Sequence, residues 1–218
     1  EASLMRIELA YGNTGLGVEL PDGLDVTIVG PRSVPGLVAP EERLAEALER
    51  PLSARPLREI AQPGMRVGIV FSDITRPAPS RFMISGVLEE LAAVPGLRIT
   101  LFDALGTHRP NTESELRAIL GEDMVRSFPI VQNDAFDPGT QAVAGRTSSG
   151  NEIRLNAEFL RSDLKVLTGL VEPHMFAGFS GGAKAVLPGM AGLASILRNH
   201  AAPMIADPRA IYGVMEGN

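Results

Sequence analysis

The most unusual stretch of the sequence combines a histidine, many small residues and a single lysine. HMFAGFSGGAKAVLPGMAG, residues 174–192, contains His174 and Lys184. Backbone N–H groups of a glycine-rich turn that opens a helix form a cradle for anions, so phosphate is its natural ligand. A lysine inside such a loop could bind a phosphate or form a covalent bond through its amine. A tight turn with an exposed lysine is the structural alternative.

This stretch matches neither of the common phosphate-binding motifs. The P-loop requires Gly before its lysine and Ser or Thr after it, whereas Ala183 and Ala185 flank Lys184. The G-x-G-x-x-G dinucleotide pattern is also missing from this stretch. The loop therefore predicts an anionic ligand without identifying it.

The three histidines are the side chains best suited to proton transfer near neutral pH, and imidazole also binds nickel or zinc. His108 lies in LGTHRPNTE, His174 in EPHMFAG and His200 in RNH. The structural alternative for the first two is packing or capping near a helix, and His200 could complement a helix dipole. No H-E-x-x-H or other close pair occurs, so the sequence does not indicate a multi-histidine zinc site.

A second polar group occurs in SDITRPAP, directly after an apolar run. Arg76 could bind a carboxylate or a phosphate with two hydrogen bonds from its planar guanidinium. In the structural alternative, Asp73 caps a helix that starts at Pro77 and forms a pair with Arg76.

Three strand–loop–helix units are predicted around these residues. The strands are expected at 65–73, 97–106 and 164–174, and the helices at 81–94, 112–121 and 182–187. Apolar strands without alternation are typical of a parallel sheet that is covered on both faces. The carboxyl ends of parallel strands share one edge of the sheet, where ligands bind. We therefore expect Asp73, His108, His174 and Lys184 to lie near one another.

Smaller elements complete the predicted fold. Thr112 and Glu115 have the spacing of a capping box. Short strands are expected at 5–12, 17–23 and 24–30, helices at 39–52 and 54–64, and small strands with a hairpin between 128 and 160. The prediction is an α/β fold with a mostly parallel, helix-flanked, Rossmann-like sheet, extra small strands near the N-terminus and a hairpin in the middle. We expect residues 5–218 to form a single domain, and residues 1–4 to be an expression remnant.

The composition excludes several classes of function. The 218 residues carry a formal net charge of −6, without a basic cluster that would suit nucleic acid. Because there is no cysteine, disulfides, thiolate metal sites and a cysteine nucleophile are excluded. No apolar stretch reaches the roughly 18 residues of a membrane helix, and no secretory signal pattern is present. We expect a cytoplasmic protein that binds neither nucleic acid nor membranes.

Three motifs together resemble the nickel-dependent lactate racemase family, whose members act on lactate and related 2-hydroxy acids. They are FSDITRPAP, LGTHRPNTESEL and HMFAGFSGGAKAVLPGMAG with the later NH, and they extend from the region of Arg66 to His200. The resemblance implies a nickel pincer nucleotide, which is the nickel complex of pyridinium-3,5-bisthiocarboxylic acid mononucleotide, attached covalently to Lys184.

The resemblance also implies roles for individual residues. His200 would ligate the nickel, His108 and His174 would be the catalytic acid and base, and Arg76 would bind the substrate. The other residues expected around the cofactor are Asp73, Thr75, Gly178, Ser180, Gly181 and Gly182. A hydride from C2 of the substrate would move to the cofactor and return to either face of a 2-keto acid.

The resemblance further implies a longer enzyme with a second domain that closes over the cleft. We therefore expect the chain to be the N-terminal, cofactor-bearing half of an isomerase, a racemase or epimerase. It would depend on cofactor-maturation enzymes and on the missing C-terminal domain, and it would not racemise alone. The alternatives are a nucleotide- or phosphate-binding domain without racemase chemistry and a non-catalytic module whose glycine loop is only a turn.

Overall fold

The structure is a computed structural model that describes residues 5–12, 14–21, 23–30, 32 and 34–217. It divides into two compact units, Glu1–Val38 and Ala39–Asn218. The expected remnant at residues 1–4 lies outside the described residues. That residues 5–218 act as a single cofactor-binding domain stays a prediction.

The first unit contains an antiparallel hairpin. Strand β1 (Met5–Leu9) pairs with β2 (Leu16–Leu20), which confirms the two expected strands. The strand predicted at 24–30 is wrong, because this segment has no regular secondary structure and Val29 is 90% exposed. Its β-branched residues suit a strand, but strand structure also requires a partner, and no described strand pairs with it.

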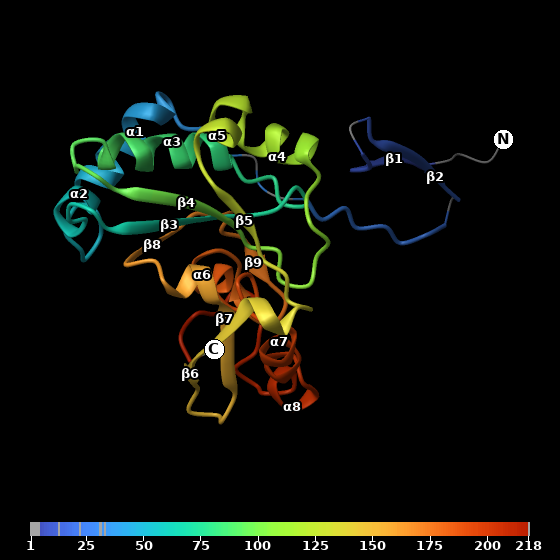
Figure 1. Ribbon diagram of the computed structural model, residues 1–218. Coiled ribbons are helices and arrows are strands. Elements are labelled where there is room, and N and C mark those ends of the chain that lie inside the picture. Colours follow the sequence, from blue (N-terminus) through green and yellow to red (C-terminus); the bar gives the residue numbers. More distant parts are fainter. Residues whose placement is uncertain (1–4, 13, 22, 31, 33, 218) are drawn as a thin grey trace. The chain divides into compact units, whose positions relative to one another are not determined.

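The second unit centres on a four-stranded parallel sheet in the order β5–β4–β3–β8 (Figure 1). Its strands are β3 (Arg66–Phe71), β4 (Arg98–Asp103), β5 (Ile130–Gln132) and β8 (Leu164–Leu167). The predicted mostly parallel, helix-flanked sheet is therefore confirmed. The chain runs outward from β3 to β4 and β5, and then returns to the other side of β3 as β8. A ligand crevice is expected where the strand order reverses in this way.

Helices cover one face of this sheet (Figure 1). They are α1 (Pro40–Glu49), α3 (Ser80–Leu91), α4 (Glu113–Leu120) and α5 (Glu122–Ser127), while the short α2 (Leu57–Ile60) precedes β3. The predicted capping box begins α4. The Thr112 hydroxyl accepts the Glu115 N–H, and the Glu115 carboxylate accepts the Thr112 N–H.

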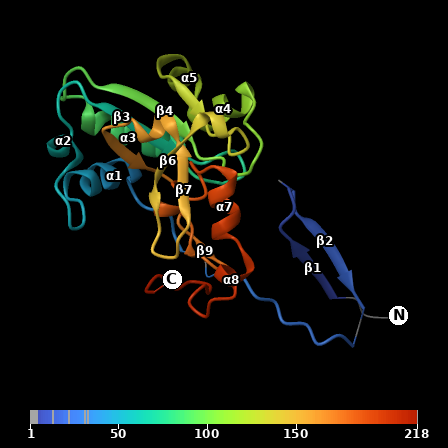
Figure 2. The same ribbon diagram turned by 60° about the horizontal axis from the view of Figure 1, so that its bottom comes forward.

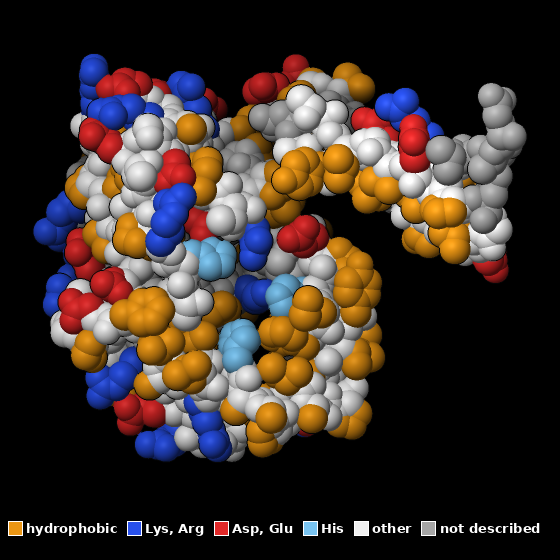
Figure 3. Space-filling view, turned by 90° about the vertical axis from the view of Figure 1, so that its right-hand side faces the viewer, with side chains coloured by type: hydrophobic (Ala, Val, Ile, Leu, Met, Phe, Trp, Pro, Cys, Tyr) orange, Lys and Arg blue, Asp and Glu red, His pale blue; other side chains and the backbone are white. Residues whose placement is uncertain are grey.

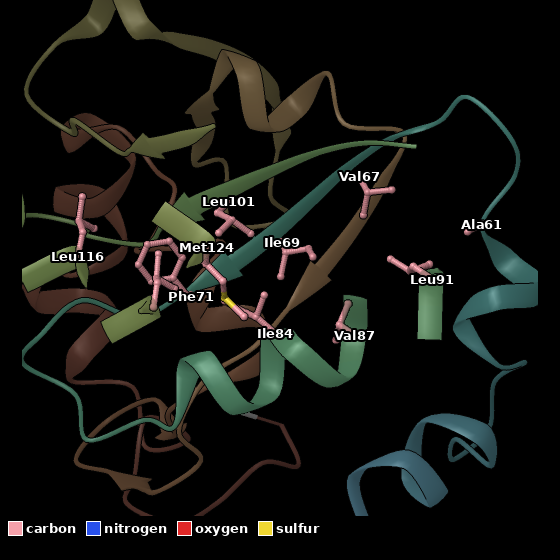
Figure 4. Close-up of a cluster of buried hydrophobic side chains, with 11 residues drawn as sticks. Ala61, Val67, Ile69, Phe71, Ile84, Val87, Leu91, Leu101, Leu116 and Met124 are labelled. Atoms are coloured by element: carbon pink, nitrogen blue, oxygen red, sulfur yellow. The ribbon is translucent and has the colours of Figure 1, made fainter. Parts of the chain in front are cut away.

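Alternate residues of the central strands build two hydrophobic cores, one on each face of the sheet. Ile69 of β3 packs with Ile84 of α3 in the core beneath the helices (Figure 4). The neighbouring Val70 belongs to the second core, together with Phe102 and Met190. Because both of its faces are buried, β3 shows a continuous apolar run and not alternation.

The opposite face carries the predicted hairpin and the later part of the chain. The elements there are β6 (Gln141–Arg146), β7 (Glu152–Asn156), α6 (Ala157–Leu160), α7 (Leu193–Asn199) and α8 (Ala202–Ile205), and the 3-10 turn η1 (Pro138–Thr140) precedes β6. Strands β6 and β7 pair antiparallel, and α7 contacts β7 (Figure 2). Nowhere in the described part of the chain is a helix both long and apolar enough to cross a membrane.

The glycine-rich stretch forms a compact loop. Strand β9 (Pro173–His174) pairs with β10 (Gly178–Phe179), and the 3-10 turn η2 (Gly182–Ala185) follows. The helix predicted at 182–187 is therefore present only in part, as the 3-10 helix η2. Gly182 has φ +51°, outside the helical range, and Pro188 offers no N–H to extend a helix, so only a short turn forms.

Candidate active site

A cleft of about 430 Å³ opens at the carboxyl ends of β3, β4 and β8, where the strand order reverses. The predicted site residues that line it are Asp73, Arg76, His108, His174, Ser180, Gly181, Lys184 and His200. Figure 3 shows the pale-blue histidines around a hollow in which Lys and Arg side chains also lie. The structure thus brings the three histidines and the loop lysine together, which the parallel topology predicted for His108, His174 and Lys184.

Three other predicted residues do not line the cleft. Thr75 is exposed and hydrogen-bonds Asp73, Gly178 lies opposite His174 in the β9–β10 pair, and Gly182 is exposed in η2. Their roles towards a cofactor stay predictions.

The carboxylate of Asp73 ties two loops of the cleft together. Its Oδ1 accepts hydrogen bonds from the N–H and the hydroxyl of Thr75, at 3.0 and 2.6 Å, and its Oδ2 accepts the Nδ1–H of His108. Burial would raise the pKa of Asp73, but the hydrogen bonds from Thr75 and His108 outweigh it and hold this pKa below its usual value. The alternative in which Asp73 caps the next helix is wrong, because α3 begins after Pro79 and Thr75 and His108 occupy the carboxylate.

Each histidine is held by its Nδ1 atom. His108 Nδ1 donates to Asp73, His200 Nδ1 donates to the carbonyl of Ile196 at 2.9 Å, and His174 Nδ1 accepts the N–H of Ala177 at 3.3 Å. In the neutral rings, Nε2 therefore carries a lone pair in His108 and His200 but a proton in His174. No described residue hydrogen-bonds these Nε2 atoms, so they remain available to a ligand.

Phe176 fixes the spacing between two of the histidines. Its ring lies edge-on to His174, with centroids 4.7 Å apart, and edge-on to His200, with centroids 5.4 Å apart. Such edge-to-face packing favours one relative orientation of the rings. His174 and His200 therefore form a packed unit with Phe176.

Positive charge accumulates in the cleft. Burial lowers the pKa of the Lys184 amine, and the charge of Arg76 lowers it further. Burial also lowers the pKa of His174, followed by the positive charges of Lys184, Arg76 and His200. An anion bound among these groups would relieve their repulsion and favour their protonated forms. The cleft therefore suits a phosphate or a carboxylate.

The loop that carries Lys184 depends on close backbone approach. At Gly181, with φ +75°, a Cβ would lie 2.9 Å from Val171 Cγ2 and 3.1 Å from the Leu170 carbonyl oxygen. The Ser180 hydroxyl donates to the Leu170 carbonyl at 2.7 Å and accepts the Glu172 N–H at 3.0 Å. Through these two hydrogen bonds Ser180 stabilises the loop.

Sequence reasoning missed Asp103 and Asn111, two buried polar residues behind the cleft. Asp103 ends β4, and Asn111 donates a hydrogen bond of 2.6 Å to its carboxylate. The available signal was an acidic residue inside the apolar run LFDAL.

The sheet order defines a Rossmann-like α/β domain, and histidines and a lysine line the cleft at the carboxyl ends of its strands. The chain belongs to the family of lactate racemase N-terminal domains, whose family model matches residues 11–213.

Two curated relatives agree with this membership. The chain is 35% identical over 220 residues to a lactate racemase of Thermoanaerobacterium thermosaccharolyticum, covering 99% of this chain and 51% of the relative. It is 36% identical over 179 residues to a lactate racemase of Lactiplantibacillus plantarum, covering 82% of this chain and 42% of the relative. The chain thus spans about half the length of the curated relatives that it matches.

Solved structures show the same fold. The lactate racemase apoprotein from Thermoanaerobacterium thermosaccharolyticum superposes with a TM-score of 0.84 at 34% identity, covering 98% of this chain and 50% of that one. A protein from Thermotoga maritima superposes with a TM-score of 0.62 at 22% identity, over 80% of this chain and 44% of that one, and shows the fold alone.

Proposed function

We propose that this chain is the N-terminal, cofactor-bearing half of a racemase or epimerase that acts on small 2-hydroxy acids and uses a nickel pincer nucleotide. The observation that supports this most is the convergence of Lys184 and all three histidines on one cleft, in a member of the lactate racemase N-terminal domain family. The other half of the longer protein would complete the cleft, so the proposal does not extend to racemisation by this half alone.

Lys184 has the properties that a covalent tether requires. Its amine lines the cleft and is partly buried, and its lowered pKa increases the neutral, nucleophilic fraction. The close-packed turn at Gly181 suits the phosphate of a nucleotide. These residues therefore fit the proposed group.

His200 has the properties that a metal ligand requires. Its Nδ1 donates to the Ile196 carbonyl, which orients the ring and leaves the Nε2 lone pair for a metal ion. Within the described ranges, no three His, Asp or Glu side chains converge as a metal site. His200 would therefore hold the nickel of the proposed nucleotide through Nε2.

The remaining residues would bind the substrate and move its hydroxyl proton. Arg76 would bind the substrate carboxylate. Nε2 of His108 would accept the hydroxyl proton, and the Asp73 carboxylate would stabilise the resulting imidazolium through Nδ1. His174 would return a proton from the other side, and the negative charges of the bound ligands would favour the imidazolium form that this requires. The bound nucleotide would supply the reversible hydride-acceptor chemistry at C2, for which a 2-keto acid is the oxidised form of the substrate.

Protein made together with the cofactor-maturation enzymes should carry a covalent adduct at Lys184. Intact-mass measurement and peptide mapping would detect it. Lys184→Arg should abolish the mass increase, because it keeps the positive charge but lacks the amine that forms the bond. Lys165 is the only other lysine in the sequence, and it donates hydrogen bonds to the carbonyls of Leu160 and Ser162 outside the cleft lining. Lys165→Arg is therefore the matched control and should keep the adduct.

Two results would count against this assignment. Unmodified Lys184 in a matured, racemase-active full-length protein would exclude the covalent tether. A nucleotide that binds reversibly to an inactive full-length protein would favour the alternative of a nucleotide-binding domain without racemase chemistry.

In the matured protein, His200→Ala should remove most of the nickel while the adduct at Lys184 remains. The reason is that His200 would supply the protein ligand to the metal, whereas the bond to Lys184 does not depend on it. Elemental analysis combined with intact mass gives the ratio of nickel to adduct. His108→Ala is the control and should retain nickel. Full nickel occupancy in His200→Ala would assign the ligand to another residue.

A further inference from the structure

Asp103 is a buried carboxyl group behind the cleft that the proposed reaction does not use. It is the last residue of β4, pairs in register with Phe71 of β3, and is fully buried. Its Oδ2 accepts a hydrogen bond of 2.6 Å from Asn111 Nδ2, whereas its Oδ1 has no partner among the described residues. A buried polar atom without a partner is costly, so this residue calls for an explanation beyond packing.

Asn111 connects Asp103 to the loop that carries Asp73. Its side-chain Oδ1 accepts the N–H of Ile74 at 3.3 Å, which requires Nδ2 to face Asp103. Gln132 of β5 fixes the backbone of Asn111, because its Oε1 accepts the Asn111 N–H at 2.6 Å and its Nε2 donates to the Asn111 carbonyl at 3.1 Å. These hydrogen bonds fix the orientation of Asn111, which forms a bridge between Asp103 and Ile74.

The bridge lies between the two partners of the proposed proton-accepting pair. Ile74 directly follows Asp73, and Asn111 belongs to the same loop as His108. We propose that Asp103 is a positioning residue that acts through Asn111 to hold these two loops in the register that pairs Asp73 with His108, and that its charge acts on this pair. Only the consequence for catalysis rests on the proposed function.

The electrostatics of the site give Asp103 a second effect. Burial raises the pKa of Asp103 to about 7, the hydrogen bond from Asn111 opposes this rise, and the negative charge of Asp73 adds to it. In acid, the neutral group carries its proton on Oδ1, because Oδ2 accepts from Asn111. In alkali, a second negative charge stands near Asp73 and acts on the hydrogen bond between Asp73 and His108.

The groups that face Asp103 make Asp73 its principal charged neighbour. The loop after β3 contributes Asp73, and the loop after β4 contributes His108, which is paired to Asp73. Gln132 of β5 and the following Asn133, whose N–H donates to the Asp103 carbonyl, are neutral. A change in the charge of Asp103 therefore acts mainly on the Asp73–His108 pair.

An NMR titration of the chain itself tests this inference without cofactor or turnover. The carboxyl carbon of Asp103, assigned through its loss in Asp103→Asn, should titrate near pH 7, and the ring signals of His108 should show a step at the same midpoint. Asp103→Asn should abolish that step but leave the His108 signals unchanged in acid, because an amide oxygen can still accept from Asn111. Asp103→Leu removes the acceptor and should displace the His108 signals at every pH.

Asp163→Asn is the matched control. Asp163 pairs with Arg66 at the opposite end of β3, so its loss should leave the His108 signals unchanged. Titration of Asp103 in the ordinary carboxyl range, or unchanged His108 signals in Asp103→Leu, would overturn the inference. If the leucine variant does not fold, Asn111→Ala breaks the same bridge, and unchanged His108 signals in that variant would be equally decisive. If Asp103 and His108 titrate together in a matured full-length protein that is inactive, the inference stands. Only the proposed function would then be wrong.

Discussion

Replacing His108 or His174 by alanine in the matured full-length protein should lower the rate of racemisation by about 10²–10⁴-fold in both directions, the usual contribution of a positioned proton-transfer group. Each turnover would use one histidine as base and the other as acid, so neither direction should escape. Initial rates from each pure enantiomer would measure the loss. Arg109→Gln is a neighbouring control, because Arg109 pairs with Glu115 on the surface and does not line the cleft. It should keep the rate.

A partial reaction separates the two histidines. With substrate stoichiometric to cofactor, each single variant retains one base, so it should oxidise one enantiomer to keto acid more readily than the other. The two variants should show opposite preferences, because the histidines come from loops after different strands of the sheet. Keto acid formed per cofactor is the measurement. A shared preference, or no slowing in either variant, would mean that at least one histidine has a structural role.

The parallel sheet and its ligand edge could be predicted because burial on both faces has a direct sequence signature. The β3 segment RVGIVF is apolar without alternation, and its residues do fill cores on both sides. Parallel strands place their following loops at one edge whatever the details of packing. The meeting of His108, His174 and Lys184 therefore followed from topology alone.

Other features depend on contacts between distant segments, which a local pattern does not contain. The segment 24–30 has strand-forming residues but no partner strand. The hydroxyl of Ser180 hydrogen-bonds within its own loop. The tautomer of His108 is set by the Asp73 carboxylate, which lies 35 positions away in the chain. Asp103 lies inside the strand predicted at 97–106, and only the fold shows that it is fully buried beside Asn111.

Gly189→Ala should destabilise the chain by about 1–3 kcal/mol, the usual cost of overpacking a tight site, and should reduce the formation of the Lys184 adduct. A Cβ at this position would lie 2.3 Å from the Ala185 carbonyl oxygen and 2.8 Å from the Ala104 Cβ, so the backbone must move. Gly189 also joins the two sides of the cleft. Its N–H donates to the Lys184 carbonyl at 3.0 Å, and its carbonyl accepts the Gly106 N–H at 2.9 Å.

Movement at Gly189 would therefore shift the lysine loop away from the loop that carries His108, and both stability and tethering should suffer together. The midpoint of urea unfolding measures the first effect, and intact mass after maturation measures the second. Gly36→Ala is the matched control, because Gly36 lies outside the left-handed region and a Cβ there would meet no atom within 4 Å. It should leave both properties within the small range of an unstrained Gly→Ala change. An unchanged unfolding midpoint in Gly189→Ala would show that the loop accommodates a side chain, and the close approach would then not hold Lys184 in place.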